Sequence, residues 1–397
     1  MTGDGTGAAA RSTPGSATGD APESATGSPR QTNRTAGSDP VLRRAIARVG
    51  TRPTWAVLAV VALPFALGLV GSVPRRVQYV PLVVSAVLFG MPHGAVDHLV
   101  PARLSDVALR RSVGAVVAVY AVLGGAYLAW WFVAPVTAAA AFVAITWIHW
   151  GQGDVYLLSA ATGGTYPRSI PHRTTTLVVR GAMPMAVPLV AFPGEYRRVV
   201  ADLVGLFGAS ADPLAAAFAP GTRRVLAAAL VGLTAVQLLR GAVRIGRSDG
   251  GGDADATADA ATPGWITLAL DRGLTLDLVD TGLLWAYFLT VPPVLAVGLY
   301  FPLWHAWRHV VRLVAGDDRA ATALRDGRTG RALAKFSTDA APLTAVSLAT
   351  CAGLYLLVPD SPGGLPEVVA LYLVMIAVLT LPHLAVVTWM DRREAVW

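Results

Sequence analysis

The fold is decided by residues 112–153, SVGAVVAVYAVLGGAYLAWWFVAPVTAAAAFVAITWIHWGQG, which contain no Asp, Glu, Lys or Arg over 42 positions. A helix needs about 20 apolar residues to cross the roughly 30 Å hydrocarbon core of a bilayer, because each residue adds about 1.5 Å. The run is therefore long enough for two crossings. We expect a hinge near Ala134–Pro135, where proline interrupts helical hydrogen bonding.

Similar uncharged runs recur along the rest of the chain. They cover residues 54–74, 77–96, 281–307, 340–359 and 368–390. Two weaker candidates, 174–193 and 223–244, contain arginines. We expect Pro292–Pro293 to break the run 281–307 into two helices. The runs are continuously apolar and do not alternate, which favours helices over a β-barrel. The sequence therefore predicts an all-α, polytopic transmembrane helix bundle with about eight to ten spans. Arginines flank the runs on both sides, so the orientation in the membrane stays open.

The composition favours a membrane protein over a soluble enzyme. Charged residues make up 14 % of the chain and hydrophobic residues 54 %, with a mean hydropathy of +0.53. The net charge of +7 comes almost entirely from arginines, with Lys335 as the single lysine. Because these arginines lie between apolar runs, they suit membrane headgroups and argue against nucleic acid as a partner. The single cysteine, Cys351, excludes an intrachain disulfide and a cysteine-based metal cluster.

Two segments are too polar to belong to the bundle. Residues 1–40 consist mainly of Gly, Ala, Ser, Thr and Pro, so we expect a disordered N-terminal tail, and they lack the pattern of a signal peptide. Residues 248–263 have a similar composition and are predicted to form a flexible loop. The remaining chain, 41–397, is predicted to be one transmembrane catalytic domain.

Histidine is the most informative residue type in this chain. Polar groups at membrane depth are costly unless they are paired or bind a ligand, so they mark functional sites. Six of the seven histidines lie within or at the ends of apolar runs: His93, His98, His149, His305, His309 and His383. Only His172 falls in a polar connector.

His305 and His309 lie four residues apart in the segment PLWHAWRH. On a helix both imidazoles project from one face about one turn apart, which suits two ligands of one metal ion. The alternative is that both histidines form hydrogen bonds with neighbouring helices, while Arg308 and Arg312 mark the membrane edge.

His93 lies in the segment MPHGAVDH, between Pro92 and Gly94, which predict a locally distorted helix. Asp97 follows one turn later and is expected to accept the second N–H of His93, as carboxylates do behind metal-bound histidines. The alternative is that Asp97 pairs with His98 or with an arginine and only neutralises a buried carboxylate.

His149 lies near the end of the long run, in the segment TWIHWGQGD. Trp147 and Trp150 beside it are candidates for residues at the membrane interface. Asp154 follows five residues later and is predicted either to support His149 or to cap the end of the helix. His383 lies deep in the last run. Its possible roles are a metal ligand, a hydrogen-bond donor behind the ligands or a core residue, and we favour the last two.

Four of these histidines come from three separated helical regions that can converge in a bundle. They are His93, His149, His305 and His309. Neutral imidazoles without a thiolate suit iron, copper or zinc. Paired histidines on facing helices also bind haem, so a haem-binding membrane electron-transfer subunit is one alternative. A proton-coupled transporter that uses the buried histidines and Asp97 is another.

Four motifs make the chain similar to a known family. GMPHGAVDH at 90–98, WIHWGQGD at 147–154, WHAWRH at 304–309 and LPHLAVV at 381–387 resemble the Brp/Blh family of bacteriorhodopsin-related β-carotene 15,15′-dioxygenases. The resemblance extends from about residue 55 to residue 391. In the second motif the family usually has His-Phe-Gly before an Asp, whereas this chain has His-Trp-Gly-Gln-Gly.

The resemblance implies a multi-pass enzyme of the cell membrane that cleaves β-carotene at its central 15,15′ double bond with molecular oxygen. The products are two molecules of all-trans-retinal, which would supply a microbial rhodopsin. An apolar tunnel of matched length on either side of the metal would place the central bond there. The implied ligands of a ferrous iron are His93, His149, His305 and His309. The residues expected behind these ligands are Asp97, His98, Asp154 and His383.

Overall fold

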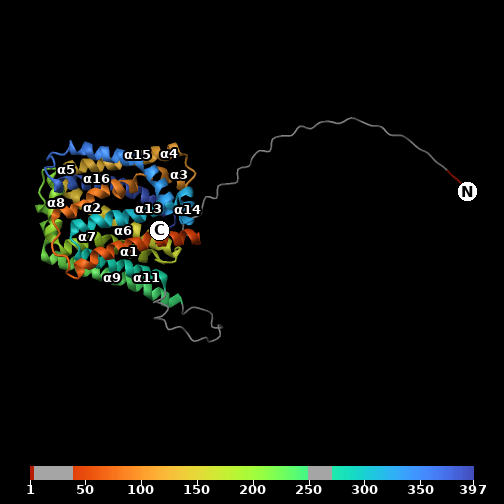
Figure 1. The fold of residues 1–397 in the computed structure, drawn as a ribbon, viewed down its shortest axis with the longest axis horizontal. Coiled ribbons are helices and arrows are strands. Elements are labelled where there is room, and N and C mark those ends of the chain that lie inside the picture. The colour runs from red at the N-terminus through yellow and green to blue at the C-terminus, as the bar shows by residue number, and fades with distance from the viewer. Residues whose placement is uncertain (4–38, 249–270) are drawn as a thin grey trace. The chain divides into compact units, whose positions relative to one another are not determined.

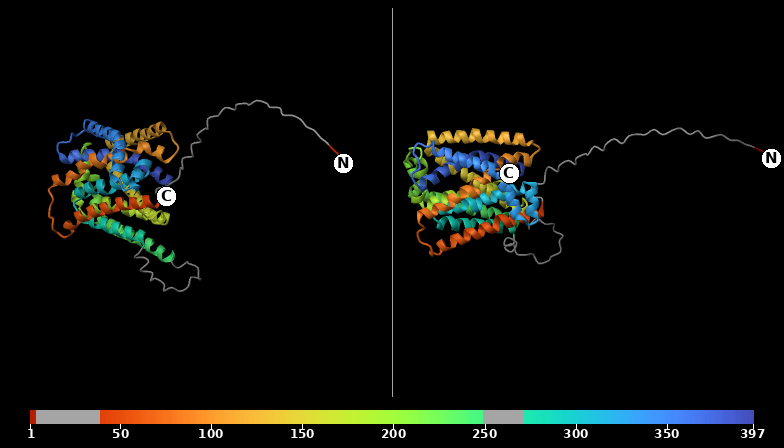
Figure 2. Two further views of the ribbon diagram at one scale, coloured as in Figure 1. Left: turned by 45° about the vertical axis from the view of Figure 1, so that its right-hand side comes forward. Right: turned by 45° about the horizontal axis from the view of Figure 1, so that its top comes forward.

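The computed structural model describes residues 1–3, 39–248 and 271–397 of the chain. Within these ranges the regular structure is helical and contains no strand, which confirms the predicted all-α fold. The long helices run alongside one another as a bundle (Figure 1, Figure 2). The predicted tail at 1–40 and the predicted loop at 248–263 lie outside the described residues, except at their ends.

The bundle is built from long helices joined by short irregular turns. The α-helices are α1 (Pro40–Ala66), α2 (Arg75–Ser85), α3 (Val100–Leu104), α4 (Leu109–Val119), α5 (Gly125–Val133), α6 (Pro135–Thr162), α7 (Ile170–Ala191), α8 (Pro193–Gly205), α9 (Pro220–Ser248), α11 (Arg272–Thr290), α12 (Pro293–Tyr300), α13 (Trp307–Ala315), α14 (Asp318–Arg325), α15 (Thr329–Tyr355) and α16 (Leu365–Arg393). The shorter segments are the π-helical η2 (Ala86–Gly90), η5 (Tyr120–Gly124) and η7 (Phe301–Ala306), and the 3-10 turns η3 (Pro92–Gly94), η4 (Asp97–Leu99) and η6 (Asp212–Phe218).

Prolines divide the long apolar runs where the sequence predicts. Ala134 separates α5 from α6, and Pro135 is the first residue of α6. α11 ends at Thr290 and α12 begins at Pro293, which confirms the second predicted break. Proline lacks the N–H that would continue a helix, but its fixed φ suits the first turn of a new one.

The first helix begins earlier than the apolar pattern predicts. α1 starts at Pro40, where the carboxylate of Asp39 accepts hydrogen bonds from two backbone amides of the first turn, at 2.9 and 3.2 Å. Such a cap satisfies donors that have no partner within the helix. The helix ends at Ala66, so only part of the predicted run 54–74 is helical.

Six helical segments among the described residues are long and apolar enough to cross a membrane, and they indicate a membrane protein. They are Pro40–Ala66, Arg75–Leu104, Leu109–Val133, Ile170–Ala191, Pro220–Val243 and Leu365–Arg393. The predicted number of eight to ten spans was too high. Helices do form at the other predicted runs, but polar side chains make them less apolar. For example, α6 carries His149 and Asp154, and α11 carries Asp277 and Asp280.

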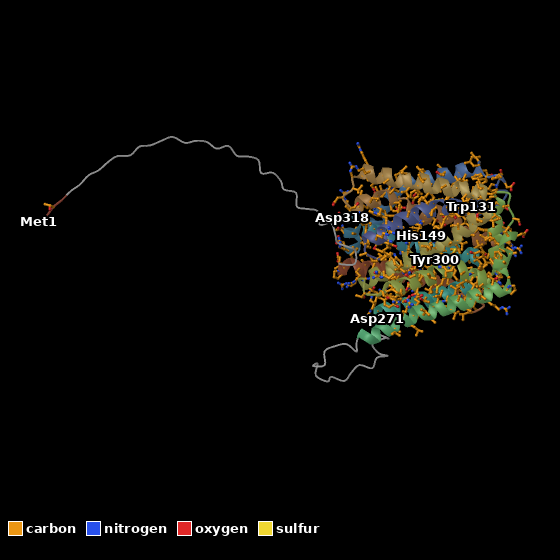
Figure 3. The ribbon with its side chains drawn as sticks, turned by 180° about the vertical axis from the view of Figure 1, so that it is seen from behind. Met1, Trp131, His149, Asp271, Tyr300 and Asp318 are labelled. Atoms are coloured by element: carbon orange, nitrogen blue, oxygen red, sulfur yellow. The ribbon has the colours of Figure 1, made fainter. Side chains whose placement is uncertain are left out.

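α6 lies at the centre of the bundle. It packs against α1, α5, α7, α8, α11, α13 and α16 (Figure 1). Two glycines permit its close approach to α7. A Cβ atom on Gly181 would lie 1.9 Å from the carbonyl oxygen of Trp147, and one on Gly151 would lie 2.2 Å from that of Leu177. This contact keeps the middle of α6, with the buried His149, inside the protein (Figure 3).

Candidate metal centre

Five histidine side chains meet inside the bundle. They are His93 on η3, His149 on α6, His305 on η7, His309 on α13 and His383 on α16. Each is at most 8 % exposed. The ring centroids of neighbouring pairs lie between 4.6 and 6.4 Å apart. The structure thus brings together the four histidines predicted as ligands, and His383 joins them.

Irregular turns carry two of these histidines. His93 lies with Pro92 and Gly94 in the 3-10 turn η3, which confirms the predicted distortion. His305 lies in the π-helical segment η7, which widens the helix between α12 and α13. Short π-helical segments within helices occur frequently at functional sites, because they re-aim a side chain without ending the helix.

The imidazole nitrogens approach one another closely enough to share one cation. Nε2 of His149 lies 3.0 Å from Nε2 of His305. One nitrogen from each of His93, His149 and His383 lies within 4.8 Å of the other two. Two imidazole nitrogens that bind one metal ion at about 2.1 Å and at right angles lie about 3 Å apart. The arrangement therefore fits a single divalent metal ion.

Three ring nitrogens of the cluster are buried and form no hydrogen bond within the described ranges. They are Nδ1 of His149, Nε2 of His309 and Nε2 of His383. Buried polar atoms are nearly always paired, and neutral imidazole is the commonest metal ligand in proteins. The donor set fits iron, copper or zinc, because it is made of imidazoles without a thiolate.

Asp97 supports His383, and the prediction that it supports His93 was wrong. Its Oδ2 accepts hydrogen bonds from Nδ1 of His383 and from the hydroxyl of Tyr120, both at 2.7 Å. His93 donates from Nδ1 to the carbonyl oxygen of Gly90 instead, at 2.5 Å. A turn separates η3 from η4, so His93 and Asp97 do not lie on one continuous helix and their side chains do not meet.

Asp154 faces away from His149. The prediction that it supports His149 was therefore wrong. Five residues along an α-helix correspond to about 500° of rotation, which leaves two side chains about 140° apart. Oδ1 of Asp154 accepts hydrogen bonds from the indole N–H of Trp304 at 3.0 Å and from Nη1 of Arg308 at 3.1 Å.

Asp154 belongs to a buried ion network that contacts a different face of η7 and α13 from the face that carries His305 and His309. The network consists of Asp154, Arg180, Asp277, Asp280 and Arg308, each at most 5 % exposed. Arg180 lies 2.6 Å from Asp277 and 3.2 Å from Asp280, and Arg308 lies 3.0 Å from Asp280. This group was not predicted from the sequence, although two acidic residues three positions apart in an otherwise apolar helix are a signal for it.

One alternative held that Arg308 and Arg312 mark the membrane edge, and this alternative was wrong. Both side chains are at most 2 % exposed. Arg308 belongs to the buried ion network, and Arg312 pairs with Asp391 at 2.8 Å. Buried charges are tolerated when they are paired in this way.

The other two histidines lie outside the cluster. His98 is half-buried and donates from Nδ1 to the carbonyl oxygen of Ala95 at 3.0 Å. His172 is buried near the start of α7, where its ring centroid lies 4.8 Å from that of Tyr166. The expectation of a polar connector at His172 was therefore wrong, because this segment packs into the protein.

One cavity adjoins the histidine cluster, and a second cavity shares four lining side chains with the first. The first, the histidine cavity, has a volume of about 450 Å³ and is lined by His93, His98, His149, His383 and Asp97, together with mainly apolar side chains of α4, α15 and α16. The second, the apolar cavity, has a volume of about 290 Å³ and is lined mainly by hydrophobic side chains of α6, α7, α8, α12 and α16. Four side chains line both cavities: Thr146, Trp150, Phe301 and Ile376.

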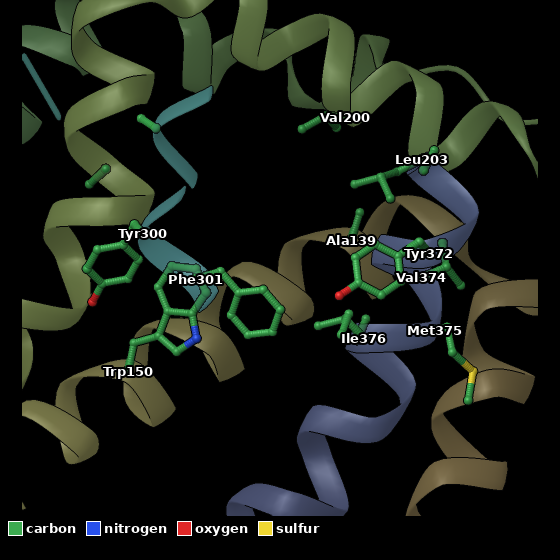
Figure 4. Close-up of a cluster of buried hydrophobic side chains, with 14 of the residues drawn as sticks. Ala139, Trp150, Val200, Leu203, Tyr300, Phe301, Tyr372, Val374, Met375 and Ile376 are labelled. Carbon is green, nitrogen blue, oxygen red and sulfur yellow. The ribbon is translucent and has the colours of Figure 1, made fainter. Parts of the chain in front are cut away.

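The aromatic side chains shared by the two cavities lie next to the histidines. The ring centroid of Trp150 lies 5.4 Å from that of His305, and the centroid of Phe301 lies 5.5 Å from that of His93. Figure 4 shows Trp150 beside Phe301, with Ile376 on the other side of the Phe301 ring. Trp150 is only 5 % exposed, so the interpretation that it lies at the membrane interface was wrong.

The chain has relatives among known proteins. The model of the family described as Beta-carotene 15,15'-dioxygenase matches residues 84–391. The chain is 44 % identical over 356 residues to the "Probable beta-carotene 15,15'-dioxygenase Blh" of Halobacterium salinarum, which covers 89 % of this chain and 95 % of that protein. It is 31 % identical over 359 residues to the "Probable beta-carotene 15,15'-dioxygenase Brp" of the same organism, which covers 86 % of this chain and 91 % of that protein. No solved structure matches the chain.

Proposed function

Because the chain belongs to the β-carotene 15,15′-dioxygenase family, we propose that it cleaves β-carotene with molecular oxygen at the central double bond, giving two molecules of all-trans-retinal. The observation that carries this proposal is the buried histidine cluster at the wall of a largely apolar cavity. β-Carotene is a hydrocarbon and partitions into the bilayer, so a cavity inside a membrane-spanning bundle can receive it directly. We place the enzyme in the cell membrane and propose that its product supplies a microbial rhodopsin.

We propose that the cluster holds a ferrous iron through His93, His149, His305 and His309. The 3.0 Å separation between the Nε2 atoms of His149 and His305 and the unpaired nitrogens of the cluster support a metal at this position. An iron held by these residues would supply the chemistry that activates molecular oxygen.

His383 lies beside the four proposed ligands, and Asp97 orients its ring. The hydrogen bond from its Nδ1 to the carboxylate leaves Nε2 as the free ring nitrogen, and this atom is buried. A carboxylate behind an imidazole fixes the tautomer and the orientation of the ring. Tyr120 in turn holds the carboxylate through its hydroxyl. We therefore assign Asp97 and Tyr120 as positioning residues for His383.

The protein contributes to the reaction mainly by positioning and by excluding water. The substrate is a chain of similar double bonds, so the site must hold one of them beside the histidines and keep the others away. Flat apolar surfaces from Trp150 and Phe301 lie within 6 Å of the histidine rings, measured between ring centroids. Their burial keeps bulk water away from the reacting bond.

The test uses the full chain, expressed in cells that accumulate β-carotene. We expect the orange colour to fade, retinal to appear on chromatography and the purified protein to contain close to one non-haem iron per chain. His305→Ala is expected to lose both iron and activity. His172→Ala removes an equally buried histidine outside the cluster, and its folded fraction is expected to keep both.

Two outcomes would contradict the proposal. The first is unchanged orange colour in cells that contain well-expressed wild-type protein. The second is a Soret band in the purified protein, which would favour the haem alternative.

A further inference from the structure

The histidine cavity and the apolar cavity are separated by a wall of four side chains. Thr146, Trp150, Phe301 and Ile376 line both cavities and come from α6, η7 and α16. None of the four is more than 9 % exposed, so the wall is internal. The two cavities are therefore neighbours inside the bundle, with these side chains between them.

The wall lies directly against the proposed metal ligands. The ring centroid of Phe301 lies 5.5 Å from that of His93 and 6.3 Å from that of His305. Thr146 precedes His149 by three residues on α6, so the two side chains project from neighbouring positions on one face of the helix. A double bond that crosses the wall therefore passes beside the imidazoles.

Phe301 is held firmly in this wall. A Cβ atom on Gly90 would lie 3.0 Å from Cε1 of Phe301 and 2.2 Å from the hydroxyl oxygen of Tyr372, so only a glycine leaves room for both rings. On its other side, the ring of Phe301 stacks on Trp150 with an interplanar angle of 19° and a centroid distance of 6.0 Å. Figure 4 shows this ring between Trp150 and Ile376.

Cleavage at the centre of a symmetrical substrate requires space for equal halves on both sides of the reacting bond. The histidine cavity is lined by the cluster and by side chains of α4, α15 and α16. The apolar cavity lies across the wall and is lined mainly by hydrophobic side chains, which suit a hydrocarbon.

We propose that β-carotene lies across the wall with one half in each cavity, and that Phe301 and Trp150 determine which double bond reaches the metal. The inference rests on the proposed function and deepens it, because it assigns the apolar cavity as the binding site for one half of the carotenoid. Phe301 and Trp150 act by contact with the polyene, so they set the position of cleavage.

The test fills the apolar cavity without touching the histidines. Val200 on α8 lines only the apolar cavity and is 7 % exposed. Val200→Phe is compared with Val231→Phe on α9, a matched control at a position that is 59 % exposed and lines neither cavity. Each variant is assayed with β-carotene and with a shortened apocarotenal that keeps the central double bond and one ring but lacks the other end.

We expect Val200→Phe to lower kcat/KM for β-carotene about tenfold or more, because the filled cavity no longer admits a ring end. Turnover of the shortened substrate stays within about twofold of the wild type, which also shows that the variant is folded and contains metal. Metal-free Val200→Phe binds β-carotene correspondingly more weakly, as followed by the absorption band of the carotenoid. Phe301→Ala widens the wall and yields aldehydes of unequal length beside retinal.

The inference is overturned if Val200→Phe cleaves both substrates at wild-type rates, or if it loses both to the same extent. It is also overturned if Phe301→Ala yields retinal alone. A wild-type protein that forms no retinal from β-carotene would instead refute the proposed function, so the two failures are distinguishable.

Discussion

Replacing Arg308 by methionine is expected to destabilise the protein by about 3–5 kcal/mol, because it leaves buried carboxylates without a counter-charge. The guanidinium donates to Oδ1 of Asp154 at 3.1 Å and to both carboxylate oxygens of Asp280, at 3.0 and 3.1 Å. All three residues are at most 5 % exposed, so water does not replace these hydrogen bonds. Methionine keeps much of the length and packing of the arginine stem, so the change removes mainly the charge.

The charge balance of the buried ion network sets the size of this effect. Its three carboxylates face only two guanidiniums, and Arg180 is the one guanidinium that remains after the substitution. The double variant Arg308→Met/Asp280→Asn removes one of the uncompensated carboxylates and is expected to regain part of the lost stability. The free energy of unfolding is measured by urea titration of the detergent-solubilised protein and compared across the variants.

Arg197→Met is the matched control for this experiment. Arg197 and Asp212 form an ion pair at 3.0 Å, but their side chains are 49 % and 77 % exposed. Exposed pairs contribute at most about 1 kcal/mol, because water and salt screen them. The reasoning is refuted if Arg308→Met costs no more than Arg197→Met, or if the double variant is less stable than Arg308→Met alone.

Three further predictions concern the same bundle. Asp97→Asn is expected to weaken iron binding about 10- to 100-fold, measured by competition with a chelator, because His383, which packs against the proposed ligands, loses the carboxylate that orients its ring. Gly181→Ala should lower the free energy of unfolding by about 1–3 kcal/mol, since the new Cβ would lie 1.9 Å from a backbone oxygen of α6. Gly232→Ala on α9, where a Cβ has nothing within 4 Å, should be neutral or stabilising. The hydrogen bond from the Leu42 amide lowers the pKa of Asp39 below 3.8. The stabilisation by Asp39 is therefore present at neutral pH and lost in acid. Asp39→Ala should cost about 0.5–2 kcal/mol at pH 7, and the difference from wild type should shrink as the pH falls below 3.8.

The local features of the fold could be predicted from the sequence. Breaks at Ala134–Pro135 and Pro292–Pro293 follow from the missing N–H of proline, and the distorted turn at His93 follows from Pro92 and Gly94. The number of spans could not be predicted as well. A helix that carries buried polar groups on one face has a lower mean hydropathy than a purely apolar helix of the same length, as α6 illustrates with Asp154.

The partners of the buried polar groups could not be predicted, because they come from distant parts of the chain. His383 and Asp97 are 286 residues apart in the sequence, and Asp154 and Arg308 are 154 residues apart. Periodicity places a side chain on a face of its own helix, but packing between helices determines which groups that face meets. For this reason His149 could be named as a candidate from the sequence, whereas the role of Asp280 could not be predicted.

The buried ion network fixes the rotation of the helical segment that carries His305 and His309. On η7 and α13, His305 and His309 occupy one face, while Trp304 and Arg308 occupy a neighbouring face about 100° away. Between membrane helices the hydrophobic effect gives little control over rotation, so packing and polar contacts fix it. Arg308 and Trp304 are tied to Asp154 on α6, and the guanidinium of Arg308 also stacks 3.4 Å from the centroid of the Trp304 ring. Rotation of this helix would break these contacts, so the network that stabilises the bundle also keeps both imidazoles directed at the proposed metal.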